Sequence, residues 1–243
     1  MRINKFFTDQ GQCSRREADR LITAGRVKIN GRTAVLGDQV TAEDTITLDN
    51  KKIVHNAAPI YIMYHKPVGV TCTSDPNTPG NIIDAVKYPS RIFAIGRLDK
   101  TSTGLIFLTN DGEIVNNILR AQFGHEKEYE VEVHGPYPDS FLQKMAAGVK
   151  LSDYKTQPCK TARLSTRKFS IILTEGKNRQ IRRMTEALGF TVMKLHRVRI
   201  MNVHIGDLKL GEWKNIPEKD LAELKLVLEK QNKTMPKDFD VEE

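Results

Sequence analysis

The chain has 243 residues, of which 28% are charged and 39% are hydrophobic, and its formal net charge of +8 favours a polyanionic partner over a small acidic ligand. No apolar run approaches the length of a membrane span, and the first residues lack the apolar core of a secretory signal, so we expect a cytoplasmic protein without a membrane contact. Cys13, Cys72 and Cys159 are widely spaced and form no CxxC pair, which indicates neither a disulfide framework nor a zinc site.

Residues 1–55 have the pattern of a small domain of their own. Apolar side chains at positions 3, 6 and 7 predict a short first helix. Ser14 and Glu17 form a capping box at the start of a second helix, and Asn30-Gly31 is a two-residue hairpin signal between β-prone segments. We therefore expect two helices followed by a small antiparallel sheet.

The second of these helices is basic. Arg15, Arg16 and Arg20 lie around one end and side of it, and we expect Lys5 nearby. Two helices, the second basic, followed by RVKINGRTAVLGDQV, resemble the S4 RNA-binding domain. That resemblance implies that these four cations contact RNA. A small helix-hairpin dimerisation module is the alternative interpretation.

A linker is predicted at residues 56–59, where a weakly patterned stretch ends in Pro59. A second domain is predicted over residues 60–230, opening with a strand at 60–64 and closing with an amphipathic helix around Leu221 and Leu228. Residues 231–243 are polar, end in acids and are predicted to be a disordered tail.

The central stretch, residues 91–112, reads RIFAIGRLDKTSTGLIFLTNDG. Apolar β-prone runs at 91–98 and 105–109 predict two strands, with Asp99 at the start of the polar turn between them. By pattern alone, an Asp at a strand end is a turn residue that bonds the nearby backbone. However, GRLD followed by TSTGLIFLTNDG resembles the catalytic loop of the pseudouridine synthases, in the branch that contains RsuA and its large-subunit relatives. The resemblance implies that Asp99 is the catalytic carboxylate.

Two more segments extend this resemblance. His65-Lys66-Pro67-Val68-Gly69 is similar to the family's NKPxG segment, with His65 in place of the usual Asn. Residues 128–133 alternate with a period of two and place Tyr129 on one face with Val131 and Val133. An inward Tyr on a strand is ordinary core, but Lys127-Glu128-Tyr129 matches the family's KEYxV motif, which implies that Tyr129 stacks against the target base.

The densest positive charge lies in residues 176–200, with seven Lys or Arg against one Glu. Asn178 is the predicted N-cap of a helix over 179–188, on which Arg179, Arg182 and Arg183 would share a face and bind phosphate. The alternative is a solvated basic surface. NRQIRRM in this segment is similar to a signature of the same synthase branch, which implies that Arg182 pairs with Asp99.

The resemblance also implies how the RNA is held. The target base leaves its stack, and Arg97 either fills the vacated space or holds the adjoining phosphate. The residues expected to contact RNA around Asp99 are Arg97, Leu98, Lys100, Arg179, Gln180, Ile181 and Arg183. Isomerising uridine needs no redox group or metal, and the six His residues show no ligand spacing, so we expect no cofactor and no metal.

Residues 195–213, LHRVRIMNVHIGDLKLGEW, resemble most closely the RluF type of large-subunit synthase. We therefore expect an α+β fold in which a mixed, mostly antiparallel sheet forms two halves with an active-site cleft between them. The function implied is that of a monomeric enzyme that isomerises a uridine of 23S rRNA. The alternatives are 16S rRNA or tRNA as target, a noncatalytic S4-type RNA-binding protein, and a metal-dependent nuclease.

Overall fold

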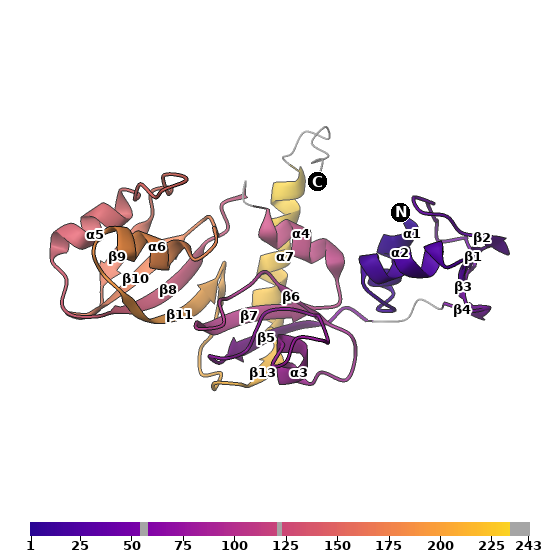
Figure 1. Cartoon of the computed structure of the whole chain (residues 1–243), viewed down its shortest axis with the longest axis horizontal. Coiled ribbons are helices and arrows are strands. Elements are labelled where there is room, and N and C mark those ends of the chain that lie inside the picture. Colours follow the sequence, from indigo (N-terminus) through magenta and orange to yellow (C-terminus); the bar gives the residue numbers. More distant parts are fainter. Residues whose placement is uncertain (54–57, 121–122, 234–243) are drawn as a thin grey trace.

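The computed structural model describes residues 1–53, 58–120 and 123–233 (Figure 1). Part of the predicted linker at 56–59, and the predicted tail from residue 234 onward, lie outside the described residues. Figure 1 shows a small N-terminal unit at one end of the molecule and a larger unit built on one long sheet. Within the described ranges, no helix combines the length and apolar character that a membrane span requires.

The N-terminal unit packs two helices against a small sheet. Helix α1 (Ile3–Asp9) and helix α2 (Arg15–Thr23) bury their apolar faces on a four-stranded antiparallel sheet of order β2-β1-β3-β4. Its strands are β1 (Val27–Ile29), β2 (Arg32–Thr33), β3 (Ile46–Leu48) and β4 (Lys51–Lys52). Ser14 caps α2 by accepting from the Glu17 N–H at 3.2 Å. The Glu17 carboxylate, however, accepts from Arg20 at 3.2 Å, so the predicted capping box forms on the serine side alone in the described structure.

The larger unit is organised around a nine-stranded sheet of order β13-β5-β7-β11-β8-β10-β9, with β6 added on β7 and β12 on β11 in the described structure. The strands are β5 (Tyr61–Lys66), β6 (Phe93–Ile95), β7 (Thr103–Thr109), β8 (Lys127–Val133), β9 (Lys160–Arg163), β10 (Lys168–Leu173), β11 (Val192–Ile200), β12 (Val203–His204) and β13 (Trp213–Asn215). Only β7 and β11 run parallel among the described pairs, which confirms the mixed, mostly antiparallel sheet.

The junction between β7 and β11 joins the two halves of the sheet and is short. Two residue pairs make it, His196 with Thr103 and Arg197 with Gly104. Gly104 has a φ of +117°, and a Cβ there would lie 2.3 Å from the Arg197 carbonyl oxygen, so only glycine permits this approach. The two halves therefore meet where the chain leaves the turn that carries Asp99.

Helices cover both faces of the sheet. They are α3 (Ile82–Val86), α4 (Gly112–Leu119), α5 (Asp139–Ala146), α6 (Gln180–Ala187) and α7 (Glu218–Lys233). Because side chains alternate along β7, Leu105 and Phe107 pack in one core with α4 and α7, while Ile106 and Leu108 join the other core with α3, α5 and α6. Figure 1 shows α4 and α7 over the half that contains β6 and β7, and α5 and α6 on the half that contains β8 and β10.

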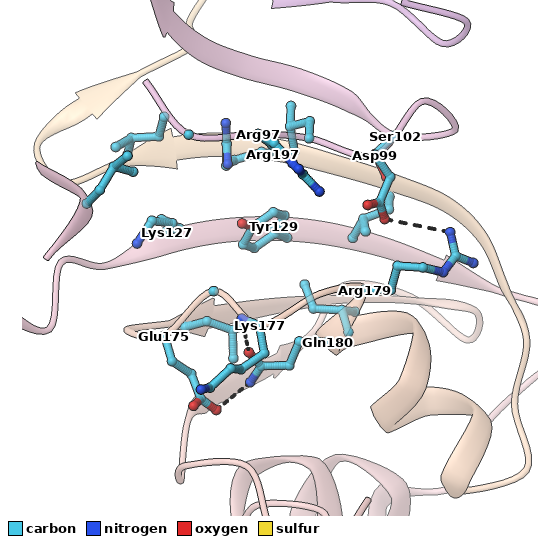
Figure 2. Close-up of a pocket in the computed structure, with 18 of the residues that line it drawn as sticks. Arg97, Asp99, Ser102, Lys127, Tyr129, Glu175, Lys177, Arg179, Gln180 and Arg197 are labelled. Carbon is cyan, nitrogen blue, oxygen red and sulfur yellow. Dashed lines mark hydrogen bonds and ion pairs between the residues drawn. The ribbon is translucent and has the colours of Figure 1, made fainter. Parts of the chain in front are cut away.

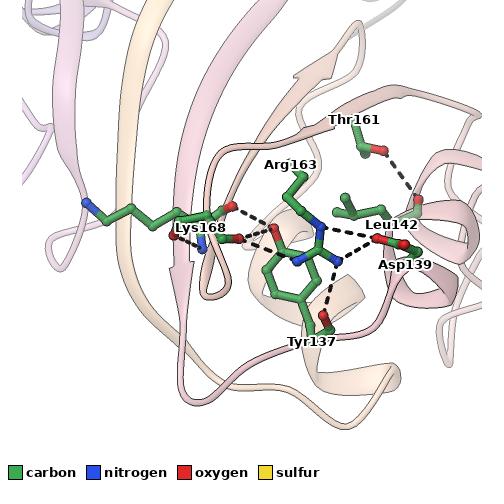
Figure 3. Close-up of polar contacts among 7 residues, drawn as sticks. Tyr137, Asp139, Leu142, Thr161, Arg163 and Lys168 are labelled. Carbon is green, nitrogen blue, oxygen red and sulfur yellow. Dashed lines mark hydrogen bonds and ion pairs between the residues drawn. The ribbon is translucent and has the colours of Figure 1, made fainter.

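A cation–aromatic cluster fixes the hairpin of β9 and β10 to the start of α5. The Arg163 guanidinium donates to Asp139 Oδ1 at 2.7 Å and to the Tyr137 carbonyl at 3.1 Å, and its Cζ lies 4.3 Å from the centre of the Tyr137 ring (Figure 3). The Tyr137 hydroxyl donates to the Lys168 carbonyl at 2.6 Å. This cluster fixes α5 against the half of the sheet that contains β8, β9 and β10.

Three predicted boundaries differ from the structure. The predicted strand at 91–98 is only β6, because Gly96 turns the chain with a φ of +73°. The Asn178 cap is wrong, since α6 begins at Gln180 and its N-cap is Arg179 in the left-handed region (φ 50°). The closing helix runs beyond residue 230 to Lys233, where Gln231 Oε1 lies 2.6 Å from His125 Nε2.

Candidate active site

A pocket of about 410 Å³ lies where the two halves of the sheet meet. Its walls come from the turn after β6, from β8 and β11, and from the segment that leads into α6. Asp99, Tyr129 and Arg197 line it together, although they lie far apart in the sequence (Figure 2). In the described ranges, no group of three or more His, Cys, Asp or Glu side chains is placed to hold a metal ion.

Asp99 is positioned by the turn between β6 and β7. The Ser102 N–H donates to the Asp99 carbonyl at 3.0 Å, which closes the turn and leaves the carboxylate in the pocket. Asp99 Oδ2 lies 3.8 Å from Arg182 Nε and 3.9 Å from Arg179 Nη1. At these distances the groups form ion pairs, but their atoms are too far apart for hydrogen bonds. The lone pairs of the carboxylate therefore stay available to a substrate.

Arg182 is tied to the same turn. Its guanidinium donates to the Thr101 carbonyl at 3.2 Å, to Ser102 Oγ at 3.3 Å and to the Val192 carbonyl at 3.3 Å. Burial lowers the pKa of Arg182, the Arg179 charge lowers it further, and the Asp99 charge opposes both. The structure thus brings Arg182 and Asp99 together as the sequence implied, through ion pairing and a shared turn.

The three arginines of the NRQIRRM segment, Arg179, Arg182 and Arg183, do not share one anion site. Because Arg179 has left-handed backbone geometry before α6, its side chain reaches Asp99 from outside the helix. Arg183 instead pairs with Asp153, and its Cζ lies 5.4 Å from the centre of the Tyr154 ring. The predicted common face is therefore divided between the pocket and the outer surface.

Tyr129 lies in the middle of the pocket wall. It is 9% exposed and points to the same side of β8 as Val131 and Val133, as the alternation predicted. Figure 2 shows Asp99 and Lys127 on opposite sides of the Tyr129 ring. Tyr129 and Asp99 therefore line the same pocket.

Two cations on the inner side of the pocket were not among the predicted site residues. Lys127 Nζ donates to the His125 carbonyl at 3.1 Å, and burial, with a contribution from the Arg197 charge, lowers the pKa of Lys127 to about 8. Arg197 is 4% exposed and pairs across the strands with Tyr129. Two sequence signals could have identified them: Lys127 belongs to the KEYxV motif, and Arg197 alternates with Leu195 on the buried face of its strand.

The other predicted residues fall into two groups. Arg97, Leu98, Gln180 and Ile181 line the pocket, and Gln180 is held by a 2.5 Å hydrogen bond from its amide to Glu175. Lys100 is exposed beside the turn and does not line the pocket.

On the N-terminal unit, Arg15, Arg16 and Arg20 are exposed on α2. Lys5 Nζ instead lies 2.9 Å from Glu113 Oε1, which links α1 to α4. That pair connects the N-terminal unit to the unit that holds the pocket.

His65, which stands where the resembled motif has Asn, does not reach the pocket. Its Nδ1 lies 2.7 Å from the Leu208 carbonyl oxygen, and its ring centre lies 5.1 Å from that of His196. The neighbouring Lys66 is fully buried and donates to the Pro67 and Val70 carbonyls at 2.8 and 2.9 Å. This segment supports the strand and the loop behind the turn of Asp99.

Residues 60–187 match the family model described as RNA pseudouridylate synthase, and residues 1–46 match that of the S4 domain. The chain is 46% identical over 239 residues to the dual-specificity RNA pseudouridine synthase RluF of Salmonella typhi, an alignment that covers 97% of this chain and 83% of that protein. It is 35% identical over 233 residues to ribosomal large subunit pseudouridine synthase B of Bacillus subtilis, covering 92% and 95%. A crystal structure of a pseudouridylate synthase superposes with a TM-score of 0.68 at 30% identity, covering 92% of this chain and 99% of that one. The chain therefore belongs to the RNA pseudouridylate synthase family, as an isomerase acting on RNA that carries an S4 domain before its catalytic domain.

Proposed function

We propose that this enzyme converts a specific uridine of 23S rRNA to pseudouridine and that Asp99 is its catalytic carboxylate. The observation that carries the proposal is the placement of Asp99 in the pocket, within 4 Å of two guanidiniums, with Tyr129 lining the same pocket. The RNA target is supported by relatives named RluF and ribosomal large subunit pseudouridine synthase B.

The chemistry needs a carboxylate at the sugar. Isomerisation breaks the bond from N1 to C1′ and joins C5 to the same carbon, so nothing is added or lost. Breaking a glycosidic bond builds positive charge on the sugar, which a nearby carboxylate stabilises or captures. Asp99 is proposed to act as this carboxylate, with the guanidiniums of Arg179 and Arg182 within 4 Å of it. Both covalent attack at C1′ and removal of a sugar proton are open to a carboxylate in this position.

Tyr129 is proposed to receive the flipped base. A uridine must leave its stack to bring C1′ to Asp99, and stacking on an aromatic ring offsets that cost by roughly 1–3 kcal/mol. Arg97, exposed at the pocket, is proposed to fill the vacated space or to hold the adjoining phosphate. Leu98, Gln180 and Ile181 then contact the flipped nucleotide as part of the pocket wall.

The RNA backbone is proposed to follow the basic surface outside the pocket. Lys100 and Arg179 lie beside the turn of Asp99, and Arg183 lies on the outer side of α6. Arg15, Arg16 and Arg20 on α2 give the S4 domain a second basic surface, with Lys5 at its edge. Phosphate contacts of this kind set position and affinity, and the shape of the RNA selects the uridine.

A direct test is to incubate the purified protein with unmodified 23S rRNA and to map pseudouridines chemically. We expect one or a few new sites, formed equally well in EDTA because no metal takes part. RNA binding without any new pseudouridine would overturn the proposal and favour the noncatalytic S4-type alternative.

A second RNA target is favoured by the words "dual-specificity" in the names of the RluF relatives. The same mapping with unmodified tRNA and 16S rRNA tests it, and conversion of neither would restrict the enzyme to 23S rRNA. We further propose that the enzyme acts as a monomer in the cytoplasm. Its sedimentation with and without RNA checks the first point, and cell fractionation checks the second.

A further inference from the structure

Arg197 lines the pocket and has a buried donor that the described part of the protein leaves unused. Its Nε donates to the Leu105 carbonyl at 2.7 Å, which fixes the guanidinium. Its Nη2 is buried and has no hydrogen-bond partner within the described part of the protein. A buried polar group without a partner is costly, and a charged one more so, which points to an acceptor that a ligand brings.

The backbone of Arg197 is held by both neighbouring strands. On one side Arg197 pairs with Gly104, where the absence of a side chain allows β11 to approach β7 closely. On the other side it pairs with Tyr129, and its Cζ lies 6.0 Å from the centre of that ring. Figure 2 shows Arg197 next to Tyr129, with Asp99 and Lys127 on opposite sides of Tyr129. A base stacked on Tyr129 therefore lies in a pocket that Asp99 and Arg197 also line.

We infer that Arg197 Nη2 donates to a carbonyl oxygen of the stacked uracil and stabilises the uracil anion that forms during the reaction. This inference rests on the proposed function of the Asp99 pocket. When the bond from N1 to C1′ breaks, its electron pair leaves with the base and spreads over N1, O2 and O4. When C5 then bonds to C1′, C5 loses its proton and N1 takes one up, so the composition of the nucleotide is unchanged.

The symmetry of uracil lets one donor serve both ends of the reaction. For C5 to replace N1 at the sugar, the ring turns about the axis through N3 and C6, and that turn exchanges O2 with O4. Arg197 therefore meets a carbonyl oxygen before and after the turn. Cytosine has an amino group at C4, which presents N–H groups to a guanidinium in one of the two orientations. The same residue therefore favours uracil over cytosine.

The test compares Arg197→Met and Arg197→Lys with Arg199→Met, an arginine on the same strand that pairs with Glu126 and Glu128 and does not line the pocket. Single-turnover conversion and RNA affinity are measured separately. Loss of one preorganised donor to a developing anion lowers the rate by roughly 100-fold or more, so we expect that loss in Arg197→Met with unchanged RNA affinity. Arg199→Met should stay within about threefold of the wild type.

The decisive comparison replaces the target uridine with 5-fluorouridine, whose fluorine stabilises the departing anion. Loss of the 5-fluorouridine nucleoside is then followed. We expect the Arg197→Met deficit to shrink at least about tenfold with this base, because the anion depends less on the guanidinium. An equal deficit with both bases would overturn the inference, and so would full activity of Arg197→Met.

Failure of this inference is separate from failure of the proposed function. If the wild type converts no uridine, the proposed function fails first; if it converts uridine normally and the two bases give equal deficits, only the role of Arg197 fails. Should Arg197→Met melt far below the wild type, Arg197→Lys replaces it in the comparison. Lysine lacks the planar fork that holds Nε on the Leu105 carbonyl while Nη2 is free for the base, so a reduced rate that recovers with 5-fluorouridine is again expected.

Discussion

Arg182 is expected to contribute to the rate through the charge it places beside Asp99. At 3.8 Å, a pair of unit charges interacts by about 4 kcal/mol at an effective dielectric of 20. The Asp99 side chain is 28% exposed and keeps the charge of Arg179 nearby, so we reduce the loss in Arg182→Met to about 2 kcal/mol, or roughly 30-fold in rate. Arg182 also anchors the turn through Thr101 and Ser102, and that loss adds to the effect.

The assay is single-turnover conversion of a saturating RNA by Arg182→Met, with Arg179→Met as the matched control. Arg179 lies at nearly the same distance from Asp99, but its side chain is 52% exposed against 13% for Arg182. Solvent screens the exposed charge more, so Arg179→Met should lose RNA affinity and only a small part of the rate. A folded Arg182→Met with a wild-type rate, or equal rate losses in both variants, would refute this account of the ion pair.

Three further predictions test the fold and the RNA surface. Gly104→Ala should lower the free energy of unfolding by at least about 2 kcal/mol, because the new Cβ would clash with the Arg197 backbone and the φ of +117° disfavours any residue with a Cβ. Chemical denaturation that shows no change would contradict the close approach of β7 to β11. Burial lowers the pKa of Lys127 from 10.5 to about 8, so between these pH values the unfolded chain binds more protons than the folded one. The free energy of unfolding should therefore rise with pH across that window, by at most about 3 kcal/mol. Denaturation of the wild type and of Lys127→Met at several pH values should show this rise in the wild type alone, and parallel curves would exclude it. Replacing Arg15 and Arg16 with Gln should reduce the slope of log affinity against log salt by about 0.7 per lost phosphate contact, and an unchanged slope in a binding titration would remove this surface from the RNA interface.

Local patterns predicted much of the chain, because their signals act over a few residues. Alternation placed Tyr129 on the buried face of β8, and the serine of the predicted capping box begins α2 as expected. The meeting of Asp99 with Arg182 was implied by two separate motifs, and the structure brings those motifs together at one turn.

What the sequence did not predict depends on tertiary contacts. Arg179 with left-handed geometry stands at the N-cap in place of the expected Asn178, and Arg183 pairs with Asp153 from a distant loop. The burial of Arg197 follows from the parallel pairing of β7 with β11, and no short pattern encodes that junction. Alternation with Leu195 was the one local signal for its burial, and it stood in a basic segment that favours an exposed surface.

The central claim, that Asp99 breaks the glycosidic bond, is tested most directly by Asp99→Asn. The amide keeps the size of the side chain but removes the charge within 4 Å of Arg179 and Arg182. The variant and the wild type are given the same unmodified RNA at concentrations where both are fully bound, and new pseudouridine is measured over time. We predict normal binding with no detectable conversion, and conversion at the wild-type rate would contradict the account.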